Sequence, residues 1–171
     1  MKNGYIGELG IILMKLKPVK VIIIDDVETY FNTQMLSIAS ANGTITFERY
    51  KKCDAILLKN LVSNPRDILI LDIKGTVTKD IGNDGFDIAK HVYNNTQTFV
   101  VITSAHKYHL KNRTNYGDYI MTDRLLTPID FTSELNLIID LYLKNKMRIY
   151  QKLLFKIGKN LSKYGFNTIG S

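Results

Sequence analysis

The chain has 171 residues, which is enough for one full α/β domain with an appendage but too few for two domains of ordinary size. Its apolar content of 45% and charged content of 23% are ordinary for a globular protein. No apolar run approaches the roughly 20 residues of a membrane span. The single cysteine, Cys53, excludes an internal disulfide and indicates a reducing compartment, which we expect to be the cytoplasm.

The formal net charge of +7 is concentrated at the C-terminal end. Residues 144–171 contain seven lysines or arginines and no acidic residue, so residues 1–143 are neutral overall. A basic segment of this kind is typical of a nucleic-acid contact, an acidic partner or a solvated helix face.

Continuous apolar runs alternate with helical stripes from residue 19 onward, whereas residues 1–18 are expected to form an N-terminal extension. The runs predict strands at 19–24, 44–48, 68–72, 99–104 and within 118–126. Helical spacing predicts helices through Val27, Phe31, Met35 and Ile38, from Ile56 to Val62 with an end near Pro65, over 85–93, near 106–114, and through Phe131, Leu135, Ile138 and Tyr142. Cys53 is expected in the second helix as a packing residue, and Asp84 and Asp130 stand at N-cap positions.

Strands that alternate with helices predict an α/β fold with a doubly wound, five-stranded parallel sheet over residues 19–143. Residues 144–171 follow it as a basic helical extension. In such sheets, ligands bind outside the carboxyl ends of the strands. The residues that end or follow the predicted strands are Asp25, Asp26, Asp72, Ser104 and Thr127.

The three aspartates define a candidate site. Carboxylates in contact repel by on the order of several kcal/mol per pair, so a cluster favours a bound cation, and oxygen ligands with open water positions suit Mg²⁺. A carboxylate beside Mg²⁺ can attack phosphorus because the metal neutralises the phosphoryl oxygens. The hydroxyl of Ser104 can then hydrogen-bond the new phosphate. The alternative interpretation makes Asp25, Asp26 and Asp72 separate strand-end caps and turn formers.

Residues 19–143 resemble the receiver domain of two-component response regulators, the family of the chemotaxis protein CheY. The segments that carry the resemblance are VIIIDD (21–26), ILILD (68–72), NDGFDIAK (83–90), VVITSA (100–105) and TP (127–128). They occur in the order of the family, and the intervals between them match the usual intervals closely. The resemblance implies the flavodoxin/CheY-like form of the predicted sheet.

The same resemblance implies that Asp72 accepts a phosphoryl group from a sensor histidine kinase or a phosphotransfer protein. Asp26 would bind Mg²⁺ directly and Asp25 largely through water, with the main-chain carbonyl of Lys74 as a further ligand. Ser104 would contact the phosphoryl group. The implied protein is a signalling domain and not an enzyme. It would form a homodimer through its fourth and fifth helices and have no membrane partner.

The chain departs from the family at Thr127, where the family has a Lys that pairs with the aspartate and with its phosphate. Lys74 and Arg124 are nearby cations, but neither stands at the family position. Arg124 also replaces the switch aromatic, and Tyr119 is the nearest aromatic residue. Two interpretations therefore stay open: a phosphorylated receiver, and a phosphorylation-independent pseudo-receiver that only binds a partner.

The stretch DIKGTVT (72–78) also resembles the first motif of haloacid-dehalogenase-type phosphotransferases, which form an aspartyl phosphate with Mg²⁺. A small aspartyl-phosphate phosphatase is therefore a second alternative. Against it, the general acid/base aspartate of that motif is Lys74 here, and Lys107 and Lys111 do not match the third motif. In the receiver interpretation, GTVT is expected to be a flexible loop.

Two stripes continue past residue 144 on the predicted helix. The apolar stripe contains Ile149, Leu153, Ile157 and Leu161, and the basic stripe contains Arg148, Lys152, Lys156, Lys159 and Lys163. Such a helix can dock on a partner, contact nucleic-acid phosphates or carry a solvated face. Gly158 is expected to interrupt it. On very few residues, the segment resembles the start of the DNA-binding domain of the master sporulation regulator, so we expect it to open a larger output domain.

Overall fold

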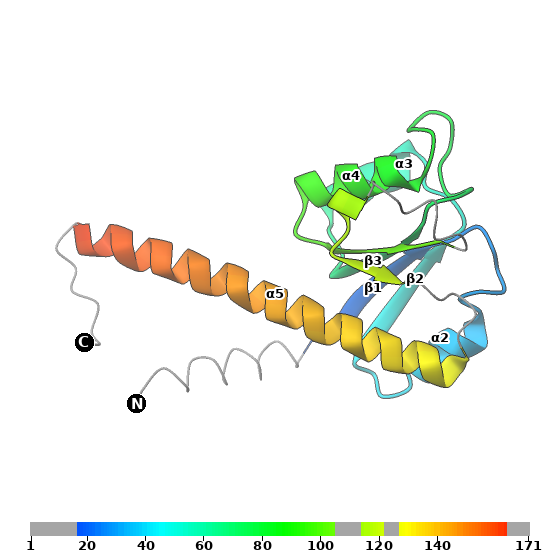
Figure 1. The fold of residues 1–171 in the computed structure, drawn as a ribbon, viewed down its shortest axis with the longest axis horizontal. Helices are drawn as coiled ribbons and strands as arrows, with labels where there is room; N and C mark the ends of the chain where they lie inside the picture. The colour runs from blue at the N-terminus through cyan, green and yellow to red at the C-terminus, as the bar shows by residue number, and fades with distance from the viewer. Residues whose placement is uncertain (1–16, 105–113, 122–126, 164–171) are drawn as a thin grey trace. The chain divides into compact units, whose positions relative to one another are not determined.

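The computed structural model describes residues 17–104, 114–121 and 127–163, with the backbone alone described beyond residue 146. Five parallel strands form one sheet in the order β2-β1-β3-β4-β5 (Figure 1). The strands are β1 (Val19–Ile24), β2 (Ile45–Tyr50), β3 (Ile68–Asp72), β4 (Phe99–Thr103) and β5 (Tyr119–Met121). The predicted doubly wound, five-stranded sheet is confirmed.

Helices cover both faces of this sheet. The helical elements are α2 (Thr33–Ala39), α3 (Ala55–Ser63), α4 (Gly85–Asn95), the 3₁₀ turn η2 (Thr114–Tyr116) and α5 (Pro128–Lys163). Helices α3 and α4 lie on one face and α2 on the other (Figure 1). The strand order reverses between β1 and β3, because β2 lies outside β1 while β4 and β5 extend the sheet beyond β3. The carboxyl ends of β1 and β3 therefore form the switch point at which such sheets bind ligands.

The core lies on both sides of the sheet, since successive strand residues point to opposite faces. Toward α3 and α4, one cluster contains Ile22, Ile24, Leu69, Leu71, Val100 and Ile102 of the strands with Phe86, Ile88 and Val92 of α4. On the other face, the ring centroid of Phe131 lies 5.5 Å from that of Phe31 and 6.4 Å from that of Phe47. Because both faces are covered, β1, β3 and β4 are nearly continuous apolar runs.

The first predicted helix is shorter than its apolar stripe. Helix α2 begins after Asn32, whose side-chain oxygen accepts a hydrogen bond from the backbone N–H of Met35 at 3.0 Å. Phe31 and Met35 are buried, but Val27 and Ile38 are 37% and 46% exposed. Since residues 28–31 form turns, the helical spacing there reflects single buried residues and not a continuous helix.

Cys53 lies outside α3, which corrects the prediction. It forms an isolated parallel bridge with Val77, and α3 begins after Asp54, whose Oδ1 accepts a hydrogen bond from the Leu57 N–H at 2.8 Å. Cys53 is fully buried, as expected for a packing residue, and burial raises the pKa of its thiol to about 12.

Helix α5 runs without a break for 36 residues, so Gly158 does not interrupt it. A glycine inside a helix costs only about 1 kcal/mol, which neighbouring residues can offset. The predicted apolar stripe in its first half is buried: Phe131, Leu135, Ile138 and Tyr142. Asp130 is not the N-cap that the sequence predicts. It lies in the first turn, and its N–H donates to the hydroxyl of Thr127 at 3.2 Å.

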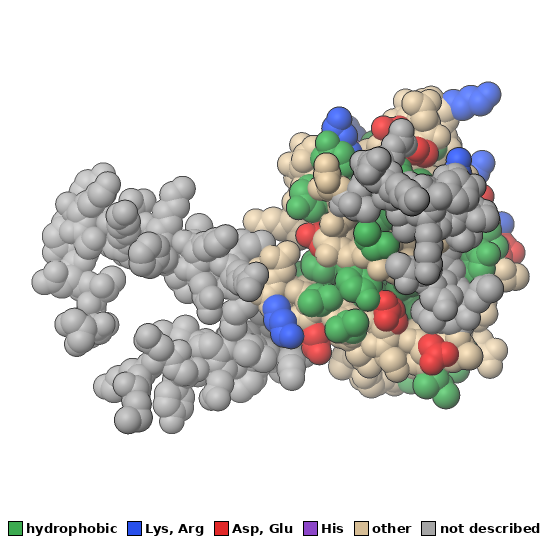
Figure 2. Space-filling model, viewed as in Figure 1, with side chains coloured by type: hydrophobic (Ala, Val, Ile, Leu, Met, Phe, Trp, Pro, Cys, Tyr) green, Lys and Arg blue, Asp and Glu red, His purple; other side chains and the backbone are tan. Residues whose placement is uncertain are grey.

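Backbone contacts divide the chain into two units, residues 1–135 and 136–171. Among the described residues, no helix is both long and apolar enough to cross a membrane. Most of the predicted N-terminal extension and of the polar helix near 106–114 lies outside the described residues. On the face shown in Figure 2, the described residues present a mixture of apolar, acidic and basic side chains.

Candidate metal and phosphoacceptor site

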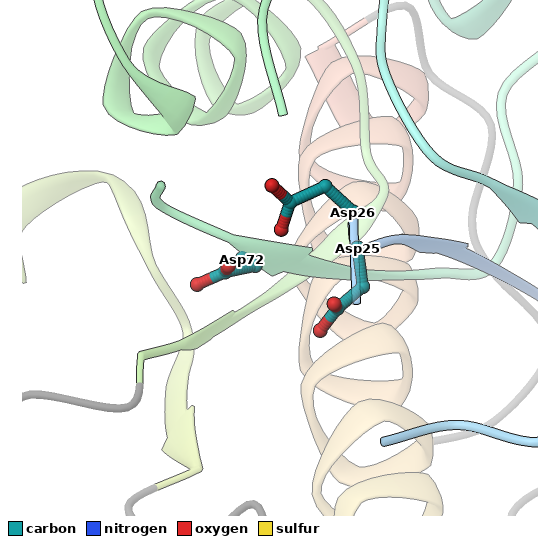
Figure 3. Close-up of side chains that lie close together, drawn as sticks. All are labelled: Asp25, Asp26 and Asp72. Carbon is teal, nitrogen blue, oxygen red and sulfur yellow. The ribbon is translucent and has the colours of Figure 1, made fainter. Parts of the chain in front are cut away.

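Asp25, Asp26 and Asp72 lie together at the carboxyl ends of β1 and β3 (Figure 3). Each offers one carboxylate oxygen, and these oxygens all lie within 4.8 Å of one another. In the parallel pairing of β1 with β3, Ile24 lies opposite Leu71, so the two aspartates that follow come side by side. Asp25 and Asp72 are buried, whereas Asp26 is exposed. The structure thus brings the three predicted aspartates together.

Backbone hydrogen bonds hold the two buried carboxylates. Asp25 Oδ1 accepts from the N–H of Val27 at 2.8 Å, and the N–H of Asp25 donates to the carbonyl of Tyr50 at 3.0 Å. Asp72 Oδ1 accepts from the N–H of Ile73 at 2.7 Å. A cation would therefore meet carboxylates that are already ordered, which lowers the entropy cost of binding.

The three negative charges repel one another at this distance. Two unit charges 4.8 Å apart, the upper limit of these separations, repel by about 3.5 kcal/mol at an effective dielectric constant of about 20. A divalent cation among the oxygens removes this cost, and a ligand set made of carboxylates suits Mg²⁺ better than metals that prefer nitrogen or sulfur. Asp26 is open to solvent, which suits Mg²⁺ because this ion keeps several of its waters. The residues present therefore fit Mg²⁺.

The loop after β3 forms one wall of the site. Gly75 has φ +70°, and a Cβ added to it would lie 1.9 Å from Asp26 Oδ2. Two features favour glycine at this position: the backbone is in the left-handed region, and the carboxylate of Asp26 approaches closely. Lys74, whose main-chain carbonyl is the predicted further metal ligand, is the exposed residue immediately before Gly75.

The same loop is fastened at two further points. Thr76 is fully buried, and its hydroxyl donates to the main-chain carbonyl of Asp72 at 2.7 Å. Val77 pairs with Cys53, whose N–H donates to the carbonyl of Thr76 at 2.7 Å. The GTVT segment is therefore not the flexible loop that we predict from its composition, because hydrogen bonds tie it to β3 and to the segment after β2.

Helix α4 starts directly against the end of β3. The N–H of Gly85 donates to the carbonyl of Ile73 at 2.8 Å, and a Cβ added to Gly85 would lie 2.4 Å from the carbonyl oxygen of Asp72. Asp84 is the N-cap, as predicted, and accepts from the N–H of Phe86 at 3.0 Å. The roles of Gly75 and Gly85 at the site are not predicted from the sequence, although a glycine next to a strand end or a helix start is a signal of such a role.

Ser104 lies at the same edge of the sheet. It is 3% exposed and follows Thr103, which pairs with Asp72 across β3 and β4. The exposed Thr127 donates its hydroxyl hydrogen to Asp130 Oδ2 at 2.6 Å. The side chain at the family's Lys position is therefore engaged in capping α5, and it supplies no positive charge to the site.

Tyr119, the nearest candidate for the switch aromatic, lies in β5. Its hydroxyl donates to Glu134 Oε1 at 2.7 Å, and this hydrogen bond raises the pKa of Tyr119 to about 12. Arg124 lies outside the described residues. A pocket of about 380 Å³ beside α4 is lined by Asn83, Asp84, Phe86, Asp87, Lys90, Asn115 and Tyr116, and so does not include the aspartate cluster.

No family model matches the sequence, and no curated protein matches it either. Solved structures do match. The response regulator domain of Thermotoga maritima CheB has a TM-score of 0.54 and 15% identity, and the match covers 74% of this chain and 97% of that one. A two-component transcriptional regulator AraC from Clostridium phytofermentans has a TM-score of 0.57 and 15% identity, with 75% and 98% covered.

A third match is a fusion that contains part of the trimeric coiled coil of yeast Spc42, with a TM-score of 0.54 and 19% identity, covering 88% of this chain and 98% of that one.

The sheet topology and the aspartate cluster together make the chain a doubly wound α/β domain with an acidic cluster at its switch point. More particularly, it has the CheY-like fold of response regulator receiver domains, as the sequence predicts.

Proposed function

We propose that the protein is a two-component receiver that accepts a phosphoryl group on Asp72 from a sensor histidine kinase or a phosphotransfer protein. The observation that carries this proposal is the cluster of Asp25, Asp26 and Asp72, whose oxygens lie within 4.8 Å of one another at the switch point of a receiver fold. Asp72 ends the central strand and is held by its neighbours, as a nucleophile that must meet phosphorus in line requires.

In this proposal, a carboxylate oxygen of Asp72 attacks the phosphorus of a phosphohistidine. The new O–P bond forms as the N–P bond breaks, and the imidazole leaves with a proton from solvent. Asp25, Asp26, Asp72 and the main-chain carbonyl of Lys74 would hold Mg²⁺, which would neutralise charge on the phosphoryl oxygens. Ser104 donates its hydroxyl hydrogen to the phosphoryl group.

The alternative is a pseudo-receiver that binds its partner without phosphorylation. One observation favours it: Thr127 is committed to Asp130 and brings no cation to the position where the family has Lys. Without that charge, a phosphoryl group on Asp72 would lack one of its usual partners, and its signal would lack one route to α5.

Intact mass after incubation with acetyl phosphate and Mg²⁺ tests the proposal. The wild type and Asp140→Asn, which changes an exposed aspartate of α5, should each gain one phosphoryl group, while Asp72→Asn should gain none. A chelator should also prevent the adduct. An unmodified wild type that still binds Mg²⁺ would favour the pseudo-receiver, and release of many phosphates per chain would favour the phosphatase alternative.

The proposed switch would act through a change in charge at the site. Phosphorylation adds about 1.5 to 2 negative charges, which changes the surface that nearby helices present. We expect a homodimer through the fourth and fifth helices of the receiver fold as one readout and nucleic acid bound by the basic extension as another. The helix predicted near 106–114, the fourth in the predicted series, lies almost entirely outside the described residues. Because the chain has a single cysteine, we expect a reducing compartment, the cytoplasm.

A further inference from the structure

The buried stripe of α5 ends well before the helix does. Tyr142 is 5% exposed and is the last buried residue described in α5. One turn later stands Lys146, whose Nζ donates to the hydroxyl of Tyr142 at 2.5 Å and lies 5.0 Å from the centroid of its ring. A charged group at this position of the stripe marks its end, yet the helix continues to Lys163.

A second apolar pattern begins at that point. It consists of residues spaced alternately four and three apart: Leu143, Met147, Tyr150, Leu154, Ile157 and Leu161. This is the spacing of the a and d positions of a coiled coil, sustained over three heptads. We call these six residues the heptad seam. Leu153 flanks the seam, whereas Ile149 and Phe155 fall outside it.

The positive charges follow the same register. In the heptad that puts Met147 at position a, the five residues of the basic stripe all fall at positions b, c or f, which face away from a coiled-coil partner: Arg148, Lys152, Lys156, Lys159 and Lys163. The two remaining basic residues, Lys144 and Lys146, fall at e and g. In a parallel pair, Lys146 would meet Gln151 of the other chain and not a lysine.

A helix of this composition needs a partner. Residues 144–163 contain no acidic side chain, so no oppositely charged pair supports the helix, and Arg148, Lys152 and Lys156 repel one another at spacings of four. Isolated helices of about 15 residues are marginal in water even with favourable sequences.

We propose that the heptad seam of α5 binds the same seam of a second copy of this chain, so that the protein self-associates through a coiled coil that follows the receiver fold. The inference is independent of phosphorylation at Asp72. It explains why the chain keeps like charges on one side of the helix, since these charges then stay in water while the apolar residues are covered.

Light scattering on the full chain, without Mg²⁺ or phosphoryl donor, tests the proposal. The wild type should have at least twice the 19.5 kDa mass of one chain, and Leu154→Glu should reduce the mass to that of one chain. Lys152→Glu places the same carboxylate on the outer side of the helix and should leave the assembly intact. A monomeric wild type at tens of micromolar would overturn the proposal. Equal dissociation of the two variants would also overturn it, because the charges and not the seam would then hold the assembly.

A disulfide test uses cysteine substitutions, which place no charge on the seam. Cys53 does not interfere, because it is fully buried and burial raises the pKa of its thiol to about 12. Leu154→Cys should form a disulfide with itself if the helices are parallel. A mixture of Leu154→Cys and Tyr150→Cys should form a mixed disulfide if they are antiparallel. Lys152→Cys, on the outer side, is the control. Absence of both disulfides under oxidation would overturn the coiled coil.

Discussion

Replacing Gly75 with alanine tests how the loop after β3 supports the acidic site, and the chain contains a matched control. Gly75 and Gly43 both have φ +70°, so an alanine at either position meets the same backbone strain. They differ in their surroundings. A Cβ at Gly43 has no atom within 4 Å, whereas a Cβ at Gly75 would lie 1.9 Å from Asp26 Oδ2 and 2.6 Å from its Cγ.

The expected magnitudes follow from these two differences. A left-handed alanine costs about 1 to 2 kcal/mol, so both variants should lose about this much unfolding free energy. The carboxylate of Asp26 is exposed and can swing away, so the contact should add less than about 1 kcal/mol for Gly75→Ala. Moving a metal ligand should, however, weaken Mg²⁺ binding by about tenfold or more, which corresponds to about 1.4 kcal/mol.

Isothermal titration with Mg²⁺ and urea unfolding followed by circular dichroism measure the two effects separately. Gly43→Ala should lose stability and keep the wild-type Mg²⁺ affinity, while Gly75→Ala should lose both. Equal Mg²⁺ affinity in the two variants would refute the reasoning. Gly75 would then be only a turn residue, and the position of the Asp26 carboxylate would not depend on the absence of a side chain at residue 75.

Three other predictions concern stability and can be checked by urea unfolding. Gly85→Ala should cost about 3 kcal/mol, because the new Cβ would lie 2.4 and 2.9 Å from backbone atoms of Asp72 and Ile73, which cannot move aside; a loss below about 1 kcal/mol would contradict this. The fully buried threonines Thr76 and Thr103 should respond in opposite directions to valine. Thr76→Val loses a hydrogen bond to Asp72 and should cost about 1 kcal/mol. Thr103→Val removes a buried hydroxyl that has no hydrogen-bond partner among the described residues and should gain about 1 kcal/mol, so a loss there would show that this hydroxyl is bonded. Glu48 pairs with Arg66 through two bonds of 2.7 and 2.9 Å, and this pairing lowers the pKa of Glu48. Its stabilisation is therefore present above the ordinary glutamate pKa and is lost as the pH falls through the lowered pKa. Glu48→Gln should cost about 1 kcal/mol or less at pH 7, because the carboxylate is partly exposed, and almost nothing near about pH 2; a cost that does not change with pH would argue against the pair.

The strands could be predicted because a strand that is buried on both faces is a continuous apolar run in the sequence. The aspartates could be predicted because they follow these runs directly. The strands β1 and β3 have the predicted limits, and β4 ends one residue earlier than predicted. Once the parallel sheet is inferred, residues at its strand ends must share an edge, and Asp25, Asp26 and Asp72 do so.

The missed features depend on contacts between distant segments or on single caps. Nothing local to Cys53 indicates that it pairs with Val77, and nothing local to Thr76 indicates a buried hydroxyl bonded to Asp72. Helix α2 starts late because Asn32 caps it. The apolar spacing that begins at Val27 predicts an earlier start, since the spacing does not reveal which residue is the cap. The cap of α5 could not be predicted for a related reason. Thr127 and Asp130 are both residue types that cap helices, and only the hydrogen bond from the Asp130 N–H to the Thr127 hydroxyl distinguishes them.

The bridge between Cys53 and Val77 has a consequence for how the domain can move. Cys53 donates to Thr76 at 2.7 Å, and Thr78 donates twice to the carbonyl of Cys53, through its N–H and its hydroxyl, each at 3.1 Å. Opening the loop would break these bonds together, so the amide hydrogens of Cys53 and Thr78 should exchange as slowly as those of a strand. We therefore expect this loop to keep its shape. If Asp72 is phosphorylated as proposed, we expect the resulting movement at the ends of β4 and β5 instead.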